Sequence, residues 1–137
     1  MSVGKNTDIK SLGEIPNNFC IKNSVNQIEV LQNSDVFITH CGMNSVNESL
    51  YYGVPMVLFP QHSEQKMVGQ RVSDLGAGII LKRNNIKDIK NMTLEVIDNN
   101  KYKENAIKLS KSFHRAGGAK KAVDAILNII DATMTAD

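Results

Sequence analysis

The residues best suited to chemistry lie in one short stretch, which reads FITHCGMNSVNE at residues 37–48. An apolar run ends there, a turn containing Gly42 follows, and a helical pattern begins. Unpaired backbone N–H groups and the positive end of a helix dipole make such a turn a phosphate site. His40 can add a donor from the strand tip, and Asn44 and Ser45 can add further hydrogen bonds. The stretch therefore predicts a phosphate-binding turn.

Glu48 lies four residues after Asn44, one turn further along the same face of the predicted helix. A carboxylate there can accept hydrogen bonds from a ribose diol, so the spacing suits a nucleoside diphosphate. Each residue alone also fits a structural role. Asn44 or Ser45 can be a helix N-cap, Glu48 an exposed helix residue, and His40 a hydrogen-bonded core histidine. Only their combination at one strand-to-helix turn favours a ligand site.

A second polar turn follows the apolar run that ends at Phe59-Pro60, where Glu64 and Gln65 open another helical pattern. An adjacent acid and amide can bind sugar hydroxyls, because the carboxylate accepts and the amide both donates and accepts. The alternative is that Glu64 is a first-turn acid stabilised by the helix dipole.

The histidines and cysteines do not indicate a metal or a nucleophile. Cys20, His40, Cys41 and His62 lack the paired spacing of zinc sites, so no metal is expected. Adjacent residues at a strand end point to opposite sides, which argues against a nucleophilic pair of His40 and Cys41. We expect two free, reduced cysteines.

Short apolar runs alternate with helical patterns, which is typical of an α/β fold with a Rossmann-like parallel sheet flanked by helices. The predicted strands are Phe19–Lys22, Asp35–Thr39, Met56–Phe59 and Gly78–Leu81. The predicted helices between them are Gln27–Gln32, Asn44–Tyr52 and Glu64–Leu75, with Ser63 as an N-cap and Gly53 and Gly76 as stops. Three C-terminal helices follow, and Gly117-Gly118 separates the last two.

Length and composition restrict the class of protein to which the chain can belong. A chain of 137 residues predicts one compact unit. The net charge of +2 is too even to favour nucleic acid or an anionic membrane, and no apolar run is long enough for a membrane helix. We expect a cytoplasmic protein. Ser2-Val3-Gly4 looks like a strand end with nothing before it, which predicts that the chain is part of a longer protein or pairs with a partner.

An ordered series of motifs resembles the C-terminal, donor-binding half of family 1 UDP-dependent glycosyltransferases of the GT-B fold, most closely the bacterial macrolide glycosyltransferase type. The series comprises LGxxPxNF from Leu12, QxxVL from Gln27, FITHCGMNSxxE from Phe37, GVPM from Gly53, PxxxEQ from Pro60, RV at Arg71, LGAG from Leu75 and GGA from Gly117.

This resemblance implies that Gln27 meets uracil, that Glu48 meets the ribose, and that Glu64 and Gln65 meet the sugar. It also implies that His40, Asn44 and Ser45 meet the diphosphate. Transfer in such enzymes inverts the anomeric carbon without a metal or other cofactor. A histidine of the N-terminal acceptor domain, which is absent from this chain, acts as the base, so no catalytic residue is expected here.

Three functions follow as hypotheses. The first is the UDP-sugar-binding domain of a glycosyltransferase that transfers a hexose to a small-molecule hydroxyl, inactive without its acceptor domain. The second is a donor-binding subunit that works with a separate acceptor subunit. The third is a non-catalytic nucleotide-binding or assembly module. A thermal-shift assay with UDP separates the first two from an assembly module whose crevice is vestigial, because only a bound ligand raises the melting point.

Overall fold

The computed structural model describes residues 1–134, and the chain divides into two compact units rather than the single unit that its length predicts. The first unit, residues 1–33, contains a 3-10 helix, η1 (Ile9–Leu12), and the short helix α1 (Gln27–Gln32). The second unit begins at Ser34 and contains the sheet and the remaining helices.

The predicted strand Phe19–Lys22 is wrong, because only Lys22 takes part in β-pairing, in a single parallel bridge with Ser2. The N–H groups of Val3 and Lys22 donate across this bridge to the carbonyls of Lys22 and Met1, both at 3.0 Å. Phe19 is 52% exposed and follows a turn closed by its N–H and the Pro16 carbonyl. An apolar run extends as a strand only where a neighbour supplies continuous hydrogen bonds.

The other three predicted strands are confirmed, each somewhat shorter than its apolar run. They are β1 (Phe37–Thr39), β2 (Met56–Leu58) and β3 (Gly78–Ile80), which pair in parallel in the order β1-β2-β3. Thr39 of β1 is in register with Leu58 of β2. The carboxyl ends of β1 and β2 therefore meet at one edge of the sheet.

The helices of the second unit match the predicted helical patterns. They are α2 (Met43–Tyr51), α3 (Ser63–Asp74), α4 (Ile86–Asp98), α5 (Asn100–Arg115) and α6 (Gly118–Met134). The predicted N-cap Ser63 is wrong by one residue, since His62 has the extended backbone of a cap and Ser63 is already helical. Gly53 and Gly76 follow the ends of α2 and α3 with positive φ, as predicted.

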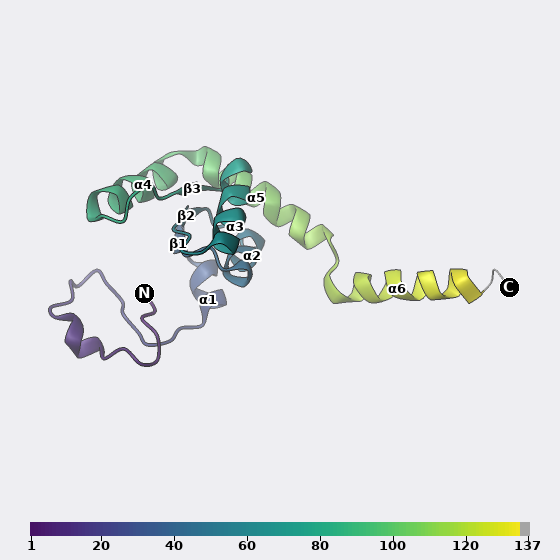
Figure 1. The fold of residues 1–137 in the computed structure, drawn as a ribbon, viewed down its shortest axis with the longest axis horizontal. Helices are drawn as coiled ribbons and strands as arrows, with labels where there is room; N and C mark the ends of the chain where they lie inside the picture. Colours follow the sequence, from purple (N-terminus) through teal and green to yellow (C-terminus); the bar gives the residue numbers. More distant parts are fainter. Residues whose placement is uncertain (135–137) are drawn as a thin grey trace. The chain divides into compact units, whose positions relative to one another are not determined.

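Side chains of β2 pack on both faces of the sheet. Met56 and Leu58 join a cluster formed with α2, α3 and α5, whereas Val57 faces a second cluster that includes Val96 of α4. Figure 1 shows the strands between α4 on one side and α2 and α3 on the other. This two-sided burial holds the strand tips, and the turns that follow them, at fixed positions.

Candidate functional site

A backbone hydrogen bond at Thr39 joins the tips of β1 and β2, and a side-chain hydrogen bond of Thr39 holds the turn that follows β1. The Thr39 carbonyl accepts the N–H of Phe59 at 2.8 Å, and its buried hydroxyl accepts the N–H of Cys41 at 3.2 Å. The two turns that carry the predicted site residues therefore begin side by side. Thr39 is not among the predicted site residues, although a hydroxyl at the end of a buried strand is a signal for a side chain that caps a turn.

The first turn of α2 presents backbone donors to the sheet edge. Gly42 is its N-cap and supplies no side chain, and the first helical bond runs from the Val46 N–H to the Gly42 carbonyl at 3.0 Å. The N–H groups of Met43 and Asn44 thus lie at the helix end, where no helical acceptor exists for them. This is the arrangement that attracts a phosphate.

His40 lies directly over this helix end. A Cβ placed on Gly42 would come within 2.9 Å of the His40 Nε2, so the exposed imidazole occupies the space beside the glycine. Asn44 and Ser45 stand in the first helical turn rather than at the N-cap, which rules out their alternative role as caps. Glu48 follows one turn later and is half-buried.

The second turn places Glu64 and Gln65 in the first turn of α3, where Glu64 is exposed and Gln65 is half-buried. Gln65 Oε1 accepts the N–H of Gln61 at 2.8 Å and the N–H of His62 at 3.3 Å. Its amide nitrogen is therefore the group that can donate to a ligand. This capping role of Gln65 was not predicted, although a glutamine three residues after the N-cap is a signal for it.

Seven of the eight predicted site residues thus follow the tips of β1 and β2 in the second unit. They are His40, Gly42, Asn44, Ser45, Glu48, Glu64 and Gln65. The eighth, Gln27, is the first residue of α1 and lies in the first unit, half-buried. Its contact with a nucleobase stays a prediction.

Both cysteines are free, Cys20 exposed and Cys41 buried. Burial raises the pKa of the Cys41 thiol from 9.0 to about 11, so the group is neutral and poorly nucleophilic at neutral pH. Within the described residues, no three His, Cys, Asp or Glu side chains lie close enough to hold a metal ion. No helix in this part of the chain is long and apolar enough to cross a membrane.

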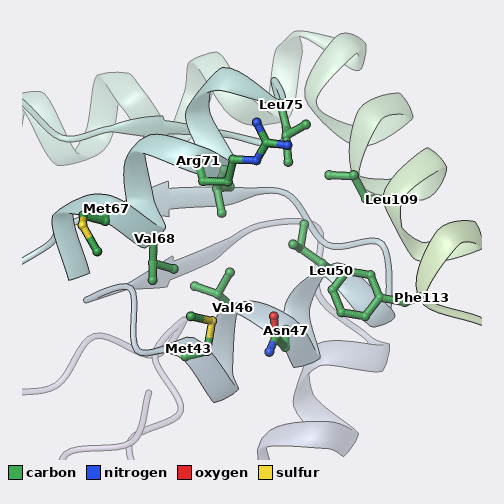
Figure 2. A pocket seen from close by; sticks show the side chains of 11 residues that line it. Met43, Val46, Asn47, Leu50, Met67, Val68, Arg71, Leu75, Leu109 and Phe113 are labelled. Atoms are coloured by element: carbon green, nitrogen blue, oxygen red, sulfur yellow. The ribbon is translucent and has the colours of Figure 1, made fainter. Parts of the chain in front are cut away.

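A separate apolar cavity of about 400 Å³ lies between α2, α3 and α5. Figure 2 shows Met43 and Met67 at one end of it and Leu109 and Phe113 of α5 at the other. Asn47 and Arg71 are its polar lining residues, and the other side chains that line it are apolar. None of the predicted site residues lines it. A diphosphate needs several donors, so this cavity does not fit the chemistry of the two strand-tip turns.

Comparison with known proteins identifies relatives for most of the chain. The family model described as UDP-glucoronosyl and UDP-glucosyl transferase matches residues 10–127. The chain is 37% identical over 132 residues to an uncharacterized UDP-glucosyltransferase, YojK, of Bacillus subtilis, covering 95% of this chain and 33% of that protein. It is 40% identical over 124 residues to the NDP-glycosyltransferase YjiC of the same organism, covering 89% of this chain and 32% of the relative. The chain therefore spans about a third of the length of these relatives.

Solved structures agree with the sequence comparison. The glycosyltransferase of kitacinnamycin superposes with a TM-score of 0.85 at 31% identity, covering 93% of this chain and 34% of that one. The calicheamicin glycosyltransferase CalG4 has the same fold, with a TM-score of 0.82 at 24% identity, covering 91% of this chain and 32% of that one. The α/β fold with a parallel sheet, expected for the C-terminal half of a GT-B enzyme, is thereby confirmed. The chain belongs to the UDP-glucuronosyl and UDP-glucosyl transferase family.

Proposed function

We propose that this chain binds a UDP-sugar as the donor half of an inverting, metal-independent glycosyltransferase that transfers a hexose to a small-molecule hydroxyl. The observation that carries the proposal is the pairing of two polar turns at neighbouring strand tips. One turn offers helix N–H groups and the His40 imidazole, and the other offers Glu64 and Gln65. Membership of the family supports UDP-sugar as the ligand.

In this proposal each group has one task. The helix end of α2 and His40 hold the diphosphate and stabilise the negative charge that grows on it as the sugar leaves. Glu48 accepts hydrogen bonds from the ribose diol, while Glu64 and the Gln65 amide bind sugar hydroxyls. The base that takes the acceptor proton belongs to an acceptor-binding part outside this chain. The chain alone then binds donor without transferring it.

Titration calorimetry with UDP on the Glu48→Ala variant tests this assignment. A hydrogen bond to a charged group contributes about 1.5–3 kcal/mol, so the variant should bind UDP roughly ten- to a hundredfold more weakly. Glu104→Ala is the matched control, because Glu104 is an exposed carboxylate on α5, far in sequence from both turns. Its affinity for UDP should equal that of the wild type.

The same titration in the presence of EDTA tests metal independence, and the affinity should not change. A wild-type chain that fails to bind UDP would refute the proposal. Equal losses in Glu48→Ala and Glu104→Ala would refute the ribose assignment, since a general loss of negative charge would then explain both.

A further inference from the structure

Cys41 has an unusual backbone conformation immediately after β1. Its φ is 69°, which makes it the one non-glycine residue with positive φ in the described chain. A left-handed backbone is strained for a residue other than glycine and persists only where surrounding contacts impose it. The N–H bond to Thr39 Oγ1 is one such contact, and complete burial of the side chain is another.

The Cys41 side chain points toward α3 and fills a space next to Gly69. A Cβ on Gly69 would lie 3.1 Å from Cys41 Sγ and 3.8 Å from Pro60 Cγ. Gly69 is buried within the helix and does not have a positive φ, so its lack of a side chain serves space rather than backbone freedom. The thiol therefore sits where three segments meet: the β1–α2 turn, the end of β2, and α3.

The contact between Cys41 and Gly69 joins the two segments that carry the proposed ligand-binding residues. His40 precedes Cys41 directly and Asn44 follows within three residues, while Gln65 stands one turn before Gly69 on α3. Closely packed contacts transmit small displacements instead of absorbing them. A change in side-chain volume at Cys41 or Gly69 should therefore move one turn relative to the other.

We propose that Cys41, through its contact with Gly69, is a positioning residue that sets the spacing between the phosphate-binding and sugar-binding turns. The inference rests on the proposed function for its catalytic meaning. The contact itself can be tested without any nucleotide.

Two substitutions, made singly and together, test the contact between Cys41 and Gly69. Gly69→Ala adds a methyl group against Sγ, Cys41→Ala removes the sulfur, and the double variant places the new methyl in the vacated space. In ¹H–¹⁵N spectra of the full chain without ligand, Gly69→Ala should shift the amide signals of His40 and Asn44. The double variant should return them toward the wild-type positions. Signals that stay unmoved in Gly69→Ala would overturn the proposal.

Affinities for UDP and UDP-glucose test the functional consequence. A misplacement of a fraction of an ångström weakens a preorganised site, so Gly69→Ala should lose about tenfold in affinity for UDP-glucose and clearly less for UDP. The double variant should recover most of this loss. Destabilisation alone would weaken the binding of both ligands alike.

Val96→Ala is the control for destabilisation, because Val96 is buried in the cluster on the opposite face of the sheet. It should lower the free energy of unfolding and leave the ratio of the two affinities unchanged. A ratio that changes equally in Val96→Ala, or a double variant no better than Gly69→Ala, would overturn the proposal. If the wild type binds neither ligand, the proposed function fails. The ligand-free spectra still decide whether the contact between Cys41 and Gly69 couples the two turns.

Discussion

Raising the pH through the titration of Cys41 should weaken the fold by a calculable amount. Burial raises the pKa of this thiol from 9.0 to about 11 in the folded chain. Because the folded pKa is the higher one, the stabilisation is fully present below pH 9 and is lost as the pH rises toward 11. At about 1.4 kcal/mol per pH unit, the loss is on the order of 2–3 kcal/mol.

Urea unfolding at pH 8, 9, 10 and 11 measures this loss when the wild type is compared with Cys41→Ala. Effects of pH on the rest of the chain are common to both proteins, so they cancel in the difference. The free-energy advantage of the wild type over the variant should shrink by about 2–3 kcal/mol across this range. Alkylation with iodoacetamide at pH 8 is a second measurement, in which exposed Cys20 should react well before Cys41.

Two parallel stability profiles would refute the reasoning, because they would mean that the Cys41 thiol ionises in the folded chain as easily as in the unfolded one. Equal alkylation rates for the two cysteines would lead to the same conclusion about the burial of this side chain.

Two further substitutions test the packing between neighbouring strands and a buried hydrogen bond of α2. Gly78→Ala should destabilise the chain by about 2–3 kcal/mol, because its Cβ would lie 2.6 Å from the Met56 carbonyl oxygen of the neighbouring strand; an unchanged urea midpoint would contradict this packing. Ser49→Ala should cost about 1–3 kcal/mol, because the fully buried hydroxyl donates to the Val54 carbonyl at 2.9 Å. Thermal unfolding measures the second loss, and a cost below a few tenths of a kcal/mol would show that the carbonyl needs no donor.

The local patterns that predicted the second unit succeeded because each is decided by near neighbours in the chain. Strands such as Met56–Leu58 are apolar throughout because helices cover both faces of the sheet. Gly53 and Gly76 end their helices because a positive φ costs glycine little. The same logic placed Asn44 and Glu48 on one helix.

The failures occur where one specific contact, and not the composition of the segment, decides the outcome. Phe19 and Cys20 have the composition of a strand, but in the described chain only Met1–Val3 pairs with this segment. The start of α3 depends on the reach of the Gln65 side chain back to His62, which moves the cap one residue before Ser63. Propensity alone does not contain either fact.

The order of amino acids was enough to identify the residues with donors and acceptors and the strand-to-helix turns that carry them, because turn chemistry and periodicity are local properties. The folded chain adds the contacts between the turns: the Phe59 N–H donates to the Thr39 carbonyl, and the Cys41 side chain lies against Gly69. Cys41 and Gly69 are separated by about thirty residues. They meet because the parallel pairing of β1 with β2 places α3 against the turn that precedes α2.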